Sequence, residues 1–211
     1  MTLLASILGC DLERVHDEVA RVEPYVDGLH FDIADGHFVP NVTFGEPLLK
    51  SLETKLPIDV HLMVTNPADH IDALHQANAR VNAISFHIEA EGDPAETLRR
   101  IKEKGLRTGV AIKAETPVEA LSPIITQVNY VILMTIVTGF SGNPFMPEPL
   151  GKIVWIREKN PNAKIIIDGG VDDKSITAIQ AAGVDTVISG RYLFQARDLA
   201  DAAGILKGSK S

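Results

Sequence analysis

Eight short apolar segments alternate with longer amphipathic stretches along the whole chain. The short segments are rich in valine, isoleucine and leucine, as expected for strands buried on both faces. They cover residues 3–8, 28–33, 58–63, 83–87, 107–112, 130–134, 164–168 and 186–189. Because helix-like sequence follows these strands at a spacing of roughly 25 residues, the pattern predicts a parallel α/β fold.

Helix-like sequence is clearest at residues 11–22, 67–75, 96–104 and 174–182. Asp11 and Asn66 are candidate N-terminal caps, and Pro67 suits a first helical position. Gly105 and Gly183 stand where the last two of these helices are expected to end.

The length of 211 residues suits one domain with a large buried core. Eight strand–helix units in this length favour a closed TIM (β/α)8 barrel over an open doubly wound sheet. The open sheet usually carries a G-x-G-x-x-G turn after its first strand, whereas residues 8–11 contain one glycine. We therefore predict a single α/β barrel domain over residues 1–211, with a tail that frays from about residue 204.

Composition narrows the class of protein. The chain is 45% hydrophobic, which excludes general disorder, and its net charge of −8 gives no general reason to bind nucleic acid or anionic lipid. Cys10 is the only cysteine, which excludes a disulfide framework. No apolar run reaches about 18 residues, and the N-terminus lacks the basic region of a signal peptide. These features predict a cytoplasmic enzyme.

Histidine and aspartate side chains stand at the carboxyl ends of three predicted strands. His30 and Asp32 share one face of the second strand, His61 lies near the end of the third, and Asp168 ends the seventh. Imidazole and carboxylate are the ligands expected for Zn²⁺, Fe²⁺, Mn²⁺ or Co²⁺. The four could converge on one metal ion at the barrel mouth, or each could be a hydrogen-bonded polar residue at the rim.

Glycine-rich loops follow the seventh and eighth predicted strands. They contain Gly169 and Gly170, and Gly190 and Arg191. Loops at these places in a barrel frequently bind phosphate, because glycine lets the backbone approach the anion. The long loop at residues 138–145 could be mobile and close a third side of such a site, or be a plain connection.

Three further residues have two open interpretations. His87 and Glu89, at the end of the fourth strand, could hold a ligating side chain in place or be polar residues at the rim. Trp155 is expected in the core or at an interface.

Five segments resemble the ribulose-phosphate 3-epimerase family. They are residues 4–8 (LASIL), 29–41 (LHFDIADGHFVPN), 59–67 (DVHLMVTNP), 134–145 and 167–171 (IDGGV). The resemblance runs in order from Ser6 to Phe194, and the motifs DGHFVPN and DVHLM are highly specific. It implies a metal-dependent isomerase that interconverts D-ribulose 5-phosphate and D-xylulose 5-phosphate. Allulose-6-phosphate 3-epimerases share this framework.

The resemblance also implies roles for individual residues. One divalent ion (Zn²⁺, Fe²⁺, Mn²⁺ or Co²⁺) would be held by His30, Asp32, His61 and Asp168. Asp32 and Asp168 would be the catalytic acid–base pair acting through a metal-stabilised enediolate. The implied substrate contacts are Ser6, His61, Met63, Met134, Gly139, Phe140, Ser141, Gly142, Gly169, Gly170, Gly190 and Arg191. Family members are commonly dimers or hexamers, which implies a homo-oligomer without nucleic-acid or membrane partners.

Several positions depart from the family pattern and leave the substrate open. The family usually carries methionine at Ala34 and serine at Gly9 and Arg191, and Lys113, Thr138 and Ser141 also differ. Ala34 is expected to leave one wall of the site open. D-Allulose 6-phosphate and a non-catalytic sugar-phosphate-binding role remain alternatives. Related decarboxylases and aldolases carry Asp-x-Lys-x-x-Asp, and residues 32–35 (DIAD) lack that lysine.

Overall fold

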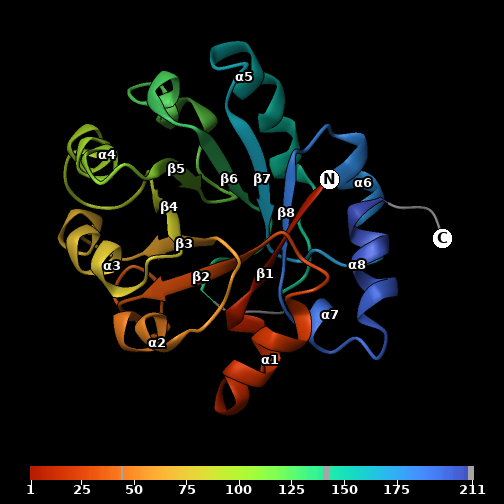
Figure 1. The fold of residues 1–211 in the computed structure, drawn as a ribbon. Coiled ribbons are helices and arrows are strands. Elements are labelled where there is room, and N and C mark those ends of the chain that lie inside the picture. Colours follow the sequence, from red (N-terminus) through yellow and green to blue (C-terminus); the bar gives the residue numbers. More distant parts are fainter. Residues whose placement is uncertain (44, 140–142, 209–211) are drawn as a thin grey trace.

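Eight parallel strands close into a barrel in chain order in the computed structural model, which describes residues 1–43, 45–139 and 143–208 (Figure 1). The strands are β1 (Thr2–Ser6), β2 (Gly28–Ala34), β3 (Ile58–Met63), β4 (Val81–His87), β5 (Arg107–Ile112), β6 (Tyr130–Met134), β7 (Lys164–Asp168) and β8 (Thr186–Ser189). This topology confirms the predicted (β/α)8 barrel.

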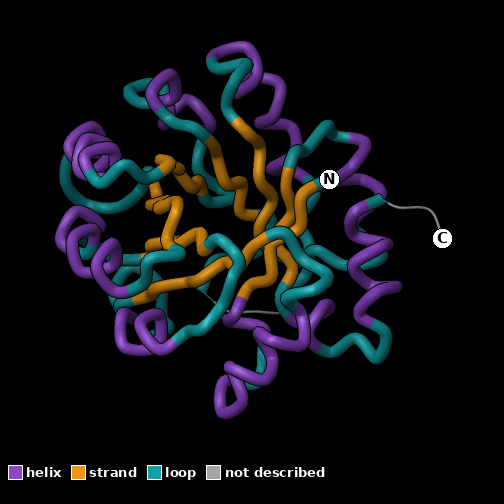
Figure 2. Tube along the Cα trace, viewed as in Figure 1, coloured by secondary structure: helices purple, strands orange, loops and turns teal. Residues whose placement is uncertain are grey.

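Helices surround the barrel on its outside, as Figure 2 shows. They are α1 (Val15–Val22), α2 (Gly45–Ser51), α3 (Ile71–Ala77), α4 (Pro94–Glu103), α5 (Lys152–Lys159), α6 (Ile176–Ala181), α7 (Arg191–Phe194) and α8 (Leu199–Lys207). Short 3-10 turns lie in the links that follow some of the strands. They are η1 (Ile7–Gly9), η2 (Leu12–Arg14), η3 (Pro67–Asp69), η4 (Val118–Leu121), η5 (Ile125–Gln127) and η6 (Glu148–Gly151).

The main hydrophobic core lies between the barrel and its helices. Every residue of β2 and of β3 is buried, as expected for strands covered on both faces. Val15, Val19 and Val22 of α1 lie on one face of that helix, and all three are buried. Burial on both sides of the sheet therefore explains the continuous apolar segments in the sequence.

Some predicted boundaries were wrong. β1 ends at Ser6, and the chain then turns into η1 instead of extending to residue 8. Residues 204–207, where the tail was expected to begin to fray, form the last turns of α8, and Leu206 there is fully buried. Residues 209–211, the end of that tail, lie outside the described residues. The link from β5 to β6 contains η4 and η5 in place of an α-helix.

Some helices also begin at residues other than those predicted, because a capping side chain fixes where the helix starts. The α4 helix begins at Pro94 because the Asp93 side chain accepts a hydrogen bond from the Ala95 N–H. Trp155 is half-buried against the core, as expected.

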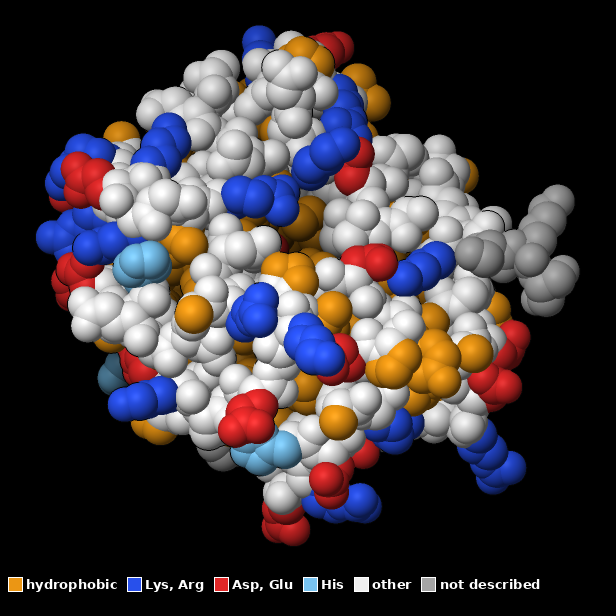
Figure 3. Space-filling model, in the orientation of Figure 1, with side chains coloured by type: hydrophobic (Ala, Val, Ile, Leu, Met, Phe, Trp, Pro, Cys, Tyr) orange, Lys and Arg blue, Asp and Glu red, His pale blue; other side chains and the backbone are white. Residues whose placement is uncertain are grey.

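The described residues contain no helix that is long and apolar enough to span a membrane. On the face drawn in Figure 3, acidic and basic side chains lie interspersed.

Candidate active site

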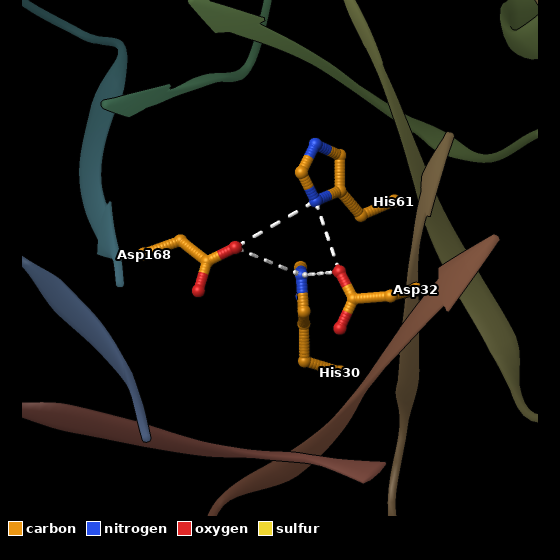
Figure 4. A group of neighbouring side chains, drawn as sticks. All are labelled: His30, Asp32, His61 and Asp168. Carbon is orange, nitrogen blue, oxygen red and sulfur yellow. Dashed lines mark hydrogen bonds and ion pairs between the residues drawn. The ribbon is translucent and has the colours of Figure 1, made fainter. Parts of the chain in front are cut away.

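Two histidines and two aspartates meet at one end of the barrel (Figure 4). One potential ligand atom from each of His30, Asp32, His61 and Asp168 lies within 4.8 Å of the other three. Oδ1 of Asp32 is 3.4 Å from Nε2 of His30 and 3.2 Å from Nδ1 of His61. Oδ2 of Asp168 lies 3.7 Å from each of these nitrogens. The structure therefore brings together all four residues expected at the metal site.

Strand register explains why these side chains converge. His30 and Asp32 are two positions apart on β2, so both face the barrel interior. Asp32 pairs with His61 across the β2–β3 ladder. Asp168 ends β7, and closure of the barrel places it opposite β2 and β3 (Figure 4).

Burial and neighbouring charges shift the pKa values of the side chains in this group. Burial opposes charge on His30, but Asp32 and Asp168 outweigh it and raise the His30 pKa to about 9. Burial and the neighbouring Asp32 charge raise the pKa of Asp168 to about 6. Burial also opposes charge on Asp32, yet the neighbouring His30 holds its pKa well below the usual range. The two carboxyl pKa values are thus pushed apart, as expected of an acid and a base that divide the work.

The residues present fit a divalent cation. Among the described residues, neither ring nitrogen of the buried His30 has a hydrogen-bond partner, and its Nε2 faces both carboxylates. A buried polar atom without a partner costs about 1–3 kcal/mol, which a bound cation would offset. Two imidazoles and two carboxylates form a donor set suited to Zn²⁺, Fe²⁺, Mn²⁺ or Co²⁺.

Further contacts hold the four side chains in place. The hydroxyl of Ser6 donates a hydrogen bond of 2.9 Å to Oδ2 of Asp32. Nε2 of His61 lies 3.0 Å from Nε2 of His87, whose Nδ1 lies 3.1 Å from Oε2 of Glu89. Thus His87 and Glu89, whose role the sequence left open, stand directly behind His61.

A cavity of about 320 Å³ opens next to this group. Asp32 and Asp168 line it, together with eight of the expected substrate contacts: Ser6, Met63, Met134, Gly139, Gly169, Gly170, Gly190 and Arg191. His61 lies outside its lining, beside the two carboxylates. Phe140, Ser141 and Gly142 lie outside the described residues.

Other lining residues were not among the expected substrate contacts. They include Leu8, Ile136, Asn143, Asp172, Tyr192 and Gln195. Each stands within a few residues of a motif that was recognised, and this proximity is the one signal that could have found them.

The structure shows the surroundings of two residues that depart from the family pattern. Ala34 is 4% exposed and packs with Val39 and Met63, and it does not line the described cavity. The ammonium of Lys113 lies 4.1 Å from the ring centre of Phe38, and Lys113 does not line the described cavity.

Solved structures with a similar fold include other barrel enzymes. The chain matches 3-hexulose-6-phosphate synthase from Salmonella typhimurium with a TM-score of 0.75 over 99% of this chain and 97% of that one. It matches KGPDC from Streptococcus mutans with a TM-score of 0.73, over 98% and 95% of the two chains. Sequence identities are 15% and 14%, so these likenesses show the fold alone.

Sequence relatives are much closer. The chain is 39% identical to a cytoplasmic isoform of ribulose-phosphate 3-epimerase from Oryza sativa subsp. japonica, over 97% of this chain and 92% of the relative. It is 35% identical to the ribulose-phosphate 3-epimerase of Helicobacter pylori, over 94% and 93% of the two chains. The model of the ribulose-phosphate 3 epimerase family matches residues 2–194. The chain therefore belongs to this family of isomerases that act on carbohydrates.

Proposed function

We propose that this protein is a metal-dependent 3-epimerase of a ketose phosphate and that it interconverts D-ribulose 5-phosphate and D-xylulose 5-phosphate. The observation that carries this proposal is the convergence of two carboxylates and two imidazoles beside a cavity. Membership of the family supplies the type of reaction. A protein that only binds a sugar phosphate has no need of an acid and a base together.

Asp32 and Asp168 act as the acid–base pair in this proposal. Epimerisation at the carbon beside a ketone removes its proton on one face and returns a proton on the other. The two carboxylates approach from opposite sides in Figure 4, and both line the cavity. Ser6 orients the Asp32 carboxylate through its hydrogen bond to Oδ2.

His30, Asp32, His61 and Asp168 would hold one divalent ion, which is Zn²⁺, Fe²⁺, Mn²⁺ or Co²⁺. When bound, such an ion acts as a Lewis acid that stabilises negative charge on the substrate oxygens. Each carboxylate has a second oxygen for proton transfer.

The sugar phosphate would lie along the cavity. Met63 and Met134 provide apolar walls and exclude water from the reacting carbon. Gly170 and Gly190 allow backbone N–H groups to approach the phosphate, and Arg191 adds a positive charge. Remote binding of the phosphate positions the reacting carbon between the two carboxylates.

D-Allulose 6-phosphate is the second candidate substrate. Arg191 lines the cavity where the family usually carries serine, so this chain recognises the phosphate end differently. We also propose that the protein forms a homo-oligomer, a dimer or a hexamer, and acts in the cytoplasm, as the name of the rice isoform states for that relative.

Proton NMR of the metal-loaded protein in D₂O tests the reaction. Ribulose 5-phosphate and allulose 6-phosphate are supplied separately, with the Asp168→Asn variant as control. Loss of the C3–H signal together with appearance of the epimer supports the proposal and ranks the two sugars. Metal binding without exchange on either sugar would contradict it.

A further inference from the structure

A second pair of side chains, a buried His87 and a partly buried Glu89, lies behind the four-residue group. His87, at the end of β4, is fully buried and contacts His61 on one side and Glu89 on the other. The two imidazole rings meet edge to edge, with centroids 5.0 Å apart and planes inclined by 26°. The proposed proton transfers make no use of His87 or Glu89.

Hydrogen-bond chemistry allows one consistent arrangement for neutral rings. A carboxylate only accepts hydrogen bonds, so the Nδ1 of His87 carries the proton that meets Glu89. The Nε2 of a neutral His87 is then an acceptor, and Nε2 of His61 must donate to it. This leaves Nδ1 of His61 without a proton, aimed at Asp32 and Asp168.

That arrangement is suited to binding a cation. The unprotonated Nδ1 of His61 would face Oδ1 of Asp32 at 3.2 Å, and both atoms are acceptors. A positive ion between them turns this repulsion into coordination. The contacts behind His61 therefore select the ring form that a metal ion requires.

A backbone hydrogen bond from a well-anchored loop holds Glu89 in turn. Its Oε1 accepts a hydrogen bond of 2.9 Å from the backbone N–H of Lys113. The loop that begins at Lys113 is tied to α5, because Nζ of Lys152 donates to the carbonyls of Lys113, Ala114 and Thr116 at 2.7, 2.9 and 2.7 Å. The carboxylate can thus hold the His87 ring in a fixed orientation.

We propose that His87 and Glu89 are positioning residues that hold His61 in the form with Nδ1 free for the metal ion. This inference rests on the proposed function in that it takes the four-residue group as the metal site. It adds that the affinity for the metal ion depends on contacts that run from His61 through His87 to Glu89, which lies outside the cavity.

The test measures the dissociation constants of Zn²⁺ and Co²⁺ by competition with a chelator. Glu89→Gln removes the charge at constant size, and Glu91→Gln makes the same change at an exposed position of the same loop as a matched control. We expect Glu89→Gln and His87→Ala to weaken binding about 10- to 100-fold, and Glu91→Gln to leave it unchanged. His87→Gln should recover part of the loss, because its oxygen can still accept from His61.

A second readout separates positioning from general damage. Nitrogen NMR of histidine-labelled, metal-free protein should show His61 protonated at Nε2 in the wild type and a mixture of forms in His87→Ala. Thermal unfolding of metal-free Glu89→Gln, which keeps the size of the side chain, should stay close to that of the wild type if the pair acts on the metal ion.

The outcomes separate the two proposals. Equal metal affinity in the wild type, Glu89→Gln and His87→Ala would overturn the positioning role, whatever the activity. A His61 ring protonated at Nδ1 in the metal-free wild type would also overturn it. Weaker metal binding in the variants together with a wild type that does not exchange C3–H would contradict the proposed function and leave the positioning role intact. A wild type that binds neither ion would overturn both.

Discussion

Gly9 and Gly190 approach so closely that a β-carbon on Gly9 would lie 2.5 Å from the Cα of Gly190. Gly9 ends η1 after the first strand, and Gly190 follows β8 at the cavity. A contact of this length between a side-chain carbon and backbone forces one of the two loops to shift. The glycine at position 9, where the family usually carries serine, is therefore a requirement of this chain's loop packing.

Gly9→Ala should weaken substrate binding more than it slows the chemical step. The added methyl group pushes Gly190 and Arg191 away from their present positions, and these residues are proposed to hold the phosphate. We expect a higher KM with a smaller change in kcat, and a loss of stability of about 1–3 kcal/mol from overpacking. Steady-state kinetics and thermal unfolding measure both effects.

Gly151→Ala is the matched control, since a β-carbon there would meet nothing within 4 Å. An unchanged KM in Gly9→Ala would show that this loop contact does not bear on the substrate.

Single replacement of either carboxylate should separate proton exchange from epimerisation. Asp168→Asn and Asp32→Asn each keep an oxygen at the same place but remove one acid–base group. We expect each variant to lose interconversion by at least about 100-fold. Each should retain slow washout of the C3 proton from one epimer only, and the two variants should prefer opposite epimers.

Deuterium incorporation into the separate epimers, followed by NMR, checks this prediction. Full interconversion in either variant would contradict the pairing of Asp32 with Asp168.

Metal binding should strengthen as pH rises from about 5 to 9. In the metal-free protein the pKa of Asp168 is raised to about 6 by burial and the Asp32 charge, and that of His30 to about 9 by the carboxylates around its buried ring. A metal ion binds the deprotonated forms, so protons compete with it below these values. Calorimetric titration in buffers of different ionisation enthalpy should detect proton release on binding.

In the Asp168→Asn variant, metal binding should no longer change with pH near 6, but it should still strengthen as the pH rises further. A dissociation constant that does not change between pH 5 and 9 would count against these four residues as the ligands.

Asp35 should stabilise the fold in a pH-dependent way. Its Oδ1 accepts hydrogen bonds of 2.8 Å from the backbone N–H groups of His37 and Phe38, and its Oδ2 accepts one of 2.7 Å from Thr65. Partial burial opposes charge on Asp35, but these bonds outweigh it and lower its pKa. We expect Asp35→Asn to destabilise the protein at pH 7 by about 1.5–3 kcal/mol.

The sign of the pH effect follows from the lowered pKa. The contribution of Asp35 is complete above the unfolded value of about 4 and fades as the pH falls through the folded pKa. The difference between wild type and variant should therefore shrink in acid. Denaturant unfolding at pH 7 and pH 3 measures it, with Asp69→Asn at an exposed position as the control. A constant difference would refute this account.

Much of the fold was predictable because strand and helix signals are local. The segments that became β3 and β5–β8 have the bounds that their apolar content predicted. The C-terminal tail was not predictable in the same way. Gly204 and the small polar residues toward the end of the chain suggest fraying, yet Leu206 is buried by packing against the barrel, which no local pattern reveals.

The sequence by itself determined which side chains stand at the strand ends. Alternation along β2 put His30 and Asp32 on one face, and three apolar residues led into Asp168. Only the tertiary structure decided that Asp168 reaches His30 and His61, because β7 meets β2 and β3 only through closure of the barrel. It also decided that His87 contacts His61 and that Gly9 packs closely against Gly190. Those contacts join segments far apart in the chain, and their distances follow from strand register and packing rather than from residue type.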